Sequence, residues 1–175
     1  MLRRRRPVCE RVGDDRFVLR LGDAERSVID RMLGDLDDLV ALAEDPTSAT
    51  VPQLTRLFPP AFTDHEGDDA ERDTEYQRLM RTELVASKRA GIAAVREAFS
   101  SADDDEVGFD TAGLTAFMQS MNSLRLVLGS LLGVTDDEAA SMVDDQIRES
   151  PEHELFAWSG WILEWVVQAL STPAN

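Results

Sequence analysis

The chain has 175 residues, which suits a single domain that buries roughly 70% of the surface exposed by its unfolded form. Its 34 acidic and 18 basic residues give a net charge of −16, and such an acidic body opposes broad binding of nucleic-acid phosphates. A single cysteine, Cys9, excludes an internal disulfide and a cysteine-rich zinc site.

The charge is unevenly distributed, with a basic start and an acidic end. Residues 1–20 have a net charge of +4 and residues 101–175 a net charge of −12. We predict a flexible basic tail over residues 1–7, which binds an acidic partner, contacts phosphates or only aids solubility. No apolar run reaches the length of a signal peptide or a membrane span, so we expect a cytoplasmic protein without a membrane partner. The cations of the tail are Arg3, Arg4, Arg5 and Arg6.

Residues 8–21 predict a β-hairpin, because apolar and polar side chains alternate beside a Gly-Asp-Asp turn signal at residues 13–15. Cys9 lies on the first strand, where it is either an ordinary strand side chain or a redox sensor. Only the neighbouring arginines could lower the pKa of its thiol and so make it reactive.

Three helices are predicted next. An amphipathic core helix begins at an N-cap at Asp23 and ends at the break at Asp45. A capping box at Thr50 opens a short helix, which the proline pair at residues 59–60 must end. A long helix then covers about residues 74–99. Its predicted buried side chains are Tyr76, Met80, Leu84, Ser87, Gly91 and Val95.

Five basic residues of the long helix fall within an arc of roughly 100°. One interpretation is that they pair with the acidic segment 136–145, within the chain or across a dimer. The functional interpretation is that an acidic protein or a nucleic acid docks on them. We call them the basic stripe, which consists of Arg78, Arg81, Lys88, Arg89 and Arg96.

A helix predicted from about Asp110 to Leu132 places Arg125 within an apolar stripe. A buried guanidinium needs a carboxylate or several carbonyl oxygens beside it, because it cannot lose its proton. We therefore expect either a buried pair, with Glu83 as a candidate acid, or a ligand pocket walled by Arg125 and Asn122.

The remaining segments complete the predicted fold. Residues 100–107 are interpreted as an acidic link, residues 135–148 as a short helix, and the last helix begins at Ser150. We interpret its three tryptophans as core or dimer interface, since they share one face. The sequence thus predicts a mainly α fold, a single-domain helical bundle over residues 8–172 with a small N-terminal β-hairpin. The tryptophans are Trp158, Trp161 and Trp165.

The motifs of common enzymes and metal sites are missing from the sequence. The chain contains no GxSxG, P-loop, GxGxxG or HExxH sequence, so we expect no catalytic activity, no cofactor and no metal. A calcium loop starting at Asp103 would have Leu114 in place of the bidentate glutamate, which favours an acidic linker. A helix-turn-helix over residues 124–148 would present acidic side chains to phosphates, so an ordinary recognition helix is excluded.

A family resemblance is carried by RLFPPAF at residues 56–62, EYQRL at residues 75–79 and NSLRLVLG at residues 122–129. Together with the Trp-rich last helix, these segments resemble an actinobacterial family of unknown function, whose genes commonly lie beside that of the protease adaptor ClpS. The resemblance covers the whole chain and implies kinship with AosR-type transcriptional regulators of oxidative stress. A family member with a cysteine pair could switch through an internal disulfide, whereas this chain has Cys9 alone.

The sequence therefore favours a non-enzymatic, stress-linked transcriptional regulator that acts through protein–protein contacts. Its candidate partners are a sigma factor or another part of the transcription apparatus, docked on the basic stripe and the basic tail, and a second copy of the chain in a homodimer. Direct DNA binding by the same basic elements is the first alternative. A small-anion sensor with its pocket at Arg125 and Asn122 is the second.

Overall fold

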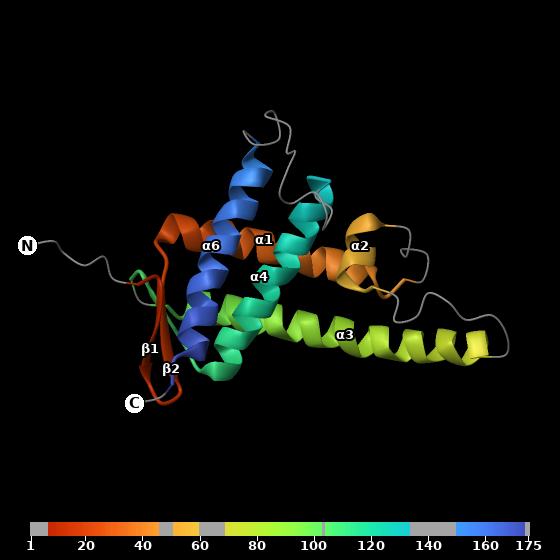
Figure 1. Cartoon of the computed structure of the whole chain (residues 1–175), viewed down its shortest axis with the longest axis horizontal. Coiled ribbons are helices and arrows are strands. Elements are labelled where there is room, and N and C mark those ends of the chain that lie inside the picture. The colour runs from red at the N-terminus through yellow and green to blue at the C-terminus, as the bar shows by residue number, and fades with distance from the viewer. Residues whose placement is uncertain (1–6, 46–50, 60–68, 103, 134–149, 174–175) are drawn as a thin grey trace, which may run out of the picture.

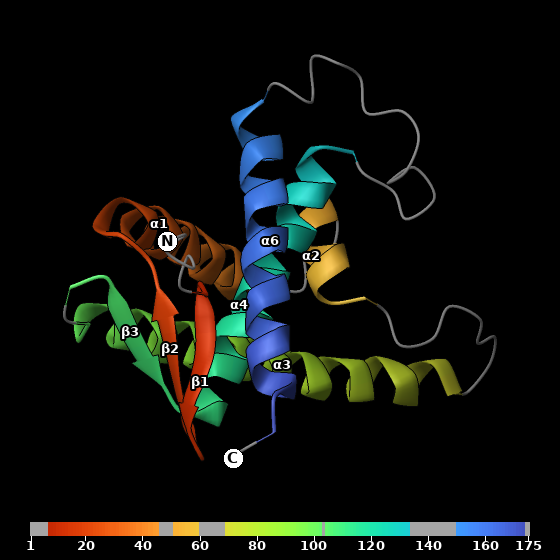
Figure 2. The same cartoon turned by 60° about the vertical axis from the view of Figure 1, so that its left-hand side comes forward.

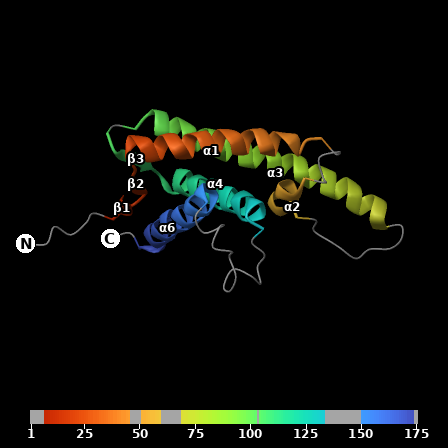
Figure 3. The same cartoon turned by 90° about the horizontal axis from the view of Figure 1, so that it is seen from above.

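The computed structural model describes residues 7–45, 51–59, 69–102, 104–133 and 150–173 (Figure 1). The fold is mostly helical, with a small three-stranded antiparallel sheet. Helices α1 (Asp23–Leu42) and α3 (Asp69–Ser100) lie side by side and run in opposite directions (Figure 3). Helices α4 (Thr111–Leu131) and α6 (Pro151–Ser171) form a second layer that crosses the first, and the short helix α2 (Pro52–Leu57) packs against α4.

The sheet lies at one end of the helices and has the strand order β1-β2-β3 (Figure 2). Strands β1 (Cys9–Gly13) and β2 (Arg16–Arg20) form the predicted hairpin, which is confirmed. Strand β3 (Glu106–Phe109) pairs with β2, so the interpretation of residues 100–107 as an acidic link was wrong at its end. Alternate residues of β2 and β3 face the core. The buried ones are Phe17, Leu19, Val107 and Phe109.

The ends of the helices follow local signals in the sequence. At the start of α4 the Asp110 carboxylate accepts a hydrogen bond from the Gly113 amide at 2.6 Å, and at the start of α6 the Ser150 hydroxyl accepts one from the His153 amide at 3.2 Å. Gly133 follows α4 with a φ of +66°, a conformation that glycine adopts without strain. The predicted starts of α4 and α6 and the predicted end of α4 are therefore confirmed.

The core lies between the two helical layers and extends to the sheet. Leu114, Phe117 and Met121 of α4 have no exposed surface. The ring of Phe117 lies 6.1 Å from the ring of Phe99 and 5.9 Å from that of Phe109, measured between centroids. These contacts join α3, α4 and β3 into one hydrophobic cluster.

The buried face of α3 differs from the predicted one. Met80 and Leu84 are 37% and 45% exposed, whereas Val85 and Ile92 are buried. At 100° per residue the apolar side chains of this helix form two lines roughly 90° apart, and only the line through Val85 faces α1 and α4. The prediction was therefore wrong for Met80 and Leu84, and Ser87 is exposed as well.

Several predictions fall outside the described residues. They concern the basic tail with Arg3, Arg4, Arg5 and Arg6, the side chain of Tyr76, the short helix over residues 135–148 and the acidic segment 136–145. None of the helices in the described ranges is long and apolar enough to cross a membrane.

Candidate functional site

The basic stripe of α3 divides into groups with different partners. Arg89 donates two hydrogen bonds to Asp37 of α1, at 2.9 and 3.2 Å, and Arg96 donates two to Asp30 of α1, at 2.8 and 3.3 Å. These hydrogen bonds raise the pKa of both guanidinium groups. Two cations of the stripe thus tie α3 to α1, and the segment 136–145 predicted as their partner lies outside the described residues.

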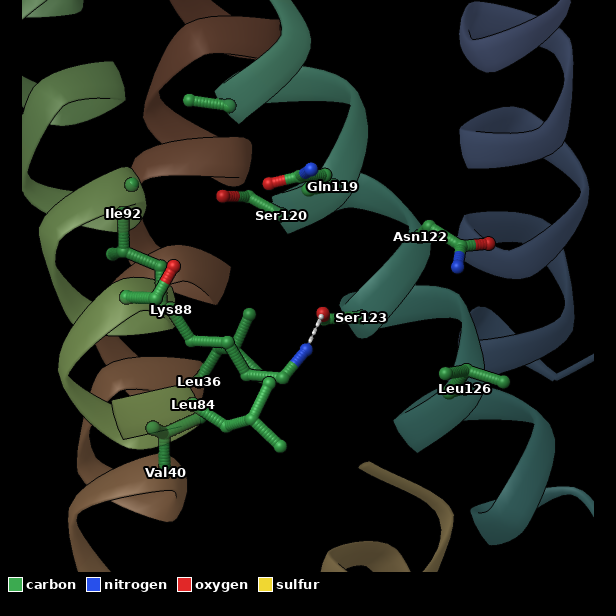
Figure 4. Close-up of a pocket in the computed structure, with 13 residues that line it drawn as sticks. Leu36, Val40, Leu84, Lys88, Ile92, Gln119, Ser120, Asn122, Ser123 and Leu126 are labelled. Carbon is green, nitrogen blue, oxygen red and sulfur yellow. Dashed lines mark hydrogen bonds between the residues drawn. The ribbon is translucent and has the colours of Figure 1, made fainter. Parts of the chain in front are cut away.

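Lys88 points into a pocket between α1, α3 and α4 (Figure 4). Its ammonium nitrogen donates a hydrogen bond to the Ser123 hydroxyl at 3.1 Å and lies 5.9 Å from the centre of the Phe58 ring. Burial lowers the pKa of Lys88, and no acid in the described part of the chain forms an ion pair with it. A partly desolvated cation of this kind is suited to holding an anion.

The pocket has a volume of about 330 Å³ and two chemically distinct walls. Hydroxyl and amide groups from α4 form the polar wall, where Lys88 reaches across from α3 toward Ser123 (Figure 4). Aliphatic side chains from α1 and α3 form the apolar wall. The polar wall includes Gln119, Ser120 and Ser123, and the apolar wall includes Leu36, Val40 and Ile92.

Arg125 lies outside this pocket and packs against α6 instead. Its guanidinium stacks 4.5 Å from the centre of the Phe156 ring, and a Cβ atom added at Gly160 would lie only 2.6 Å from its Nη1 atom. The predicted pair with Glu83 is not formed, since Glu83 is exposed and Arg125 stacks on an aromatic ring. Asn122 does belong to the lining of the pocket, but its amide points away from Lys88 (Figure 4). The pocket expected from the sequence was walled by Arg125 and Asn122, whereas the pocket in the structure has Lys88 as its cation and does not include Arg125.

Cys9 is a buried side chain of β1, with 3% of its surface exposed. Burial raises the pKa of its thiol to about 12, and the neighbouring Glu10 carboxylate acts in the same direction. Because the thiolate is the form that reacts with oxidants, this geometry favours an ordinary strand side chain over a redox sensor.

The N-terminal half of α3 extends past the other helices (Figure 1, Figure 3). Met80 and Leu84 lie one helical turn apart in α3 and are both exposed, and Leu84 also lines the pocket around Lys88. The Arg81 guanidinium lies 6.0 Å from the centre of the Phe58 ring, and Arg78 is exposed one turn before Thr82. We call Arg78, Met80, Arg81 and Leu84 the α3 end surface, an apolar area flanked by two cations.

The three tryptophans of α6 differ in how far their side chains are buried. Trp158 and Trp165 pack against the core with part of their rings exposed, whereas Trp161 is 46% exposed. Their interpretation as core residues holds for the first two. Val167 of α6 is also 49% exposed, but it lies roughly 120° around the helix from Trp161.

The role of Lys88 as a pocket residue was missed by sequence analysis, which assigned it to a surface stripe. A signal was present, because Ser120 and Ser123 recur three residues apart in an apolar helix, and both are 5% exposed. Buried hydroxyls predict a polar partner nearby.

As for metals, no group of His, Cys, Asp or Glu in the part of the chain that the structure describes could hold an ion.

Comparison with known protein families adds a further observation. Residues 5–170 match the family described as Domain of unknown function (DUF2017). The chain belongs to this family. No curated protein and no solved structure matches the chain. Two segments that carried the resemblance meet in this DUF2017 fold, since Phe58 and Ser123 both lie beside Lys88.

Proposed function

We propose that this DUF2017 protein is a non-enzymatic regulator that binds another protein through the α3 end surface. The observation that supports this is the exposure of Met80 and Leu84 beside Arg78 and Arg81, on a helix that extends past the rest of the molecule (Figure 1). Large apolar side chains next to arginines are typical of protein–protein interfaces.

The chemistry of this surface selects the partner. Its two apolar side chains would be buried by an apolar strip, and Arg78 and Arg81 would attract carboxylates at the edge of that strip. The partner is therefore an acidic amphipathic segment of another protein. The net charge of −16 opposes acidic partners over most of the chain, so such a contact is favoured at the basic elements, which are this surface and the basic tail.

The structure reduces the support for direct DNA binding. Arg89 and Arg96 hold carboxylates of α1, and Lys88 points into its pocket, so at least three of the five stripe cations are engaged within the chain. Strong phosphate binding requires many cations on one face. The resemblance to AosR-type regulators supports stress-linked transcription as the process and a sigma factor or another part of the transcription apparatus as the partner. An actinobacterial source and a gene next to that of ClpS belong to the same proposal.

The test compares two variants of the α3 end surface with a matched control. Arg81→Glu reverses a charge on this surface, Met80→Ser removes an apolar side chain that does not line the Lys88 pocket, and Arg31→Glu makes the same charge reversal on an exposed site of α1. A partner is captured by the wild type, identified and purified, and its affinity for each variant is measured by fluorescence anisotropy. We expect each α3 variant to weaken binding about tenfold or more and Arg31→Glu to leave it unchanged.

Equal affinities for the wild type and both α3 variants would contradict the proposal. The same anisotropy measurement with a DNA duplex, repeated over a range of salt concentrations, examines the alternative. Binding that falls steeply and log-linearly with salt would favour the DNA-binding function instead.

A further inference from the structure

The pocket around Lys88 combines a cation, hydroxyl groups and apolar walls (Figure 4). The Lys88 ammonium carries three N–H donors and donates to the Ser123 hydroxyl at 3.1 Å. In the described part of the chain no other side chain or carbonyl accepts a hydrogen bond from this ammonium group, and no carboxylate pairs with it. Burial also lowers the pKa of Lys88, which indicates that its charge is incompletely solvated. An anion in the pocket would supply the missing acceptor.

We propose that this pocket binds a small organic carboxylate. Its carboxylate group lies against Lys88 and Ser123, and its apolar part lies against the aliphatic wall. Ser120, which is 5% exposed, provides a second hydroxyl on the polar side. The site goes beyond the proposed function, because it needs no partner protein to form. The aliphatic wall includes Leu36, Val40 and Ile92.

The size of the pocket and its single cation select this class of ligand. A volume of about 330 Å³ lies at the small end of the range for ligand pockets, roughly 300–1,000 Å³. One ammonium group balances one negative charge, whereas a phosphate dianion is typically bound by two cations or by an arginine fork. Neither Arg81 nor Arg125 lines the pocket. The aliphatic wall provides favourable burial for hydrocarbon and none for a bare inorganic ion.

The test uses octanoate, octanamide and inorganic phosphate as probes of the purified full chain. Affinity is measured by isothermal titration calorimetry, and the site is located by amide chemical shifts. We expect octanoate to bind at least about tenfold more tightly than octanamide, which has the same hydrocarbon chain without the charge. Lys88→Met should remove this preference. Arg125→Met should keep it, since it deletes the same charge outside the pocket.

Three results would overturn the proposal. They are equal affinities of the wild type for octanoate and octanamide, unchanged octanoate binding by Lys88→Met, and tighter binding of inorganic phosphate than of octanoate. Ser123→Ala serves as a second variant that retains Lys88, in case Lys88→Met fails to fold. It should weaken octanoate several-fold while leaving octanamide unchanged, and an unaltered octanoate affinity in this variant would also contradict the assigned site.

Discussion

Replacing Gly160 by alanine tests how Arg125 packs between α4 and α6. A Cβ atom at position 160 would lie 2.6 Å from Nη1 and 3.2 Å from Cζ of Arg125, which is closer than van der Waals contact allows. The end of an arginine side chain is flexible, so the guanidinium would move rather than the backbone. It would then leave the Phe156 ring, on which it stacks at 4.5 Å.

Two opposing effects set the expected magnitude. Alanine is favoured over glycine inside a helix by about 1 kcal/mol. Displacing the half-buried Arg125 from the Phe156 ring costs about 1 kcal/mol of cation–π and packing energy. Gly160→Ala should therefore leave the stability of the wild type nearly unchanged. In an Arg125→Ala background the clash is absent, and the same substitution should stabilise the protein by about 1 kcal/mol.

Urea unfolding of the four proteins of this double-mutant cycle measures the coupling directly. Gly34→Ala in α1 is the control, because the three atoms nearest to its added Cβ belong to the Arg96 side chain of α3, none closer than 3.9 Å, and Arg125 is not among them. It should stabilise both backgrounds equally, by about 1 kcal/mol. Equal stabilisation of both backgrounds by Gly160→Ala would refute the predicted packing of Arg125. A buried ion pair at Arg125 would have predicted a loss of about 3 kcal/mol for Arg125→Ala, whereas the stack predicts about 1 kcal/mol.

Three further predictions concern titratable groups. The pKa of Lys88 is lower in the folded protein than the value of 10.5 in the unfolded chain, so between these two pKa values the unfolded chain binds more protons. The free energy of unfolding should therefore rise with pH in this range for the wild type and not for Lys88→Met, as measured by urea unfolding. Cys9, with a thiol pKa of about 12 and 3% exposure, should react with iodoacetamide at pH 8 roughly a thousandfold more slowly in the folded protein than in urea; comparable rates would contradict its burial. Asp15 accepts two hydrogen bonds from Thr111, which hold its pKa below 3.8. The stability that Asp15 contributes is therefore present above pH 3.8 and is lost as the pH falls through the lowered pKa. In Asp15→Asn the free energy of unfolding should lack this loss in the acid range.

Features that depend on neighbouring residues were predictable from the sequence. The cap at Ser150, the cap at Asp110 and the stop at Gly133 each act within one helical turn, and the structure has all three. The hairpin of β1 and β2 likewise depends on one short turn.

Features that depend on distant residues were not predictable in the same way. Strand β3 is short, and its residues form a strand because they pair with β2. Val107 lies opposite Leu19 in this pairing, although the two residues are far apart in sequence. On α3 two apolar lines compete, and the position of α1 and α4 decides which one is buried. The residues around Lys88 come from α1, from α4 and from Phe58 at the end of α2. The spacing of the basic residues along α3 therefore predicted a surface cation and could not predict the pocket.

Lys88 lies where two segments that carry the family resemblance meet, residues 56–62 through Phe58 and residues 122–129 through Ser123. A methionine would fill similar space without a charge to desolvate, so packing alone would favour methionine at this position. Lys88→Met should therefore be more stable than the wild type at neutral pH and should lose the preference for octanoate over octanamide. A residue that lowers stability while conferring binding is typical of a functional site. If Lys88→Met is instead less stable and still prefers octanoate, the ammonium is satisfied by Ser123 and Phe58, and Lys88 is a structural residue.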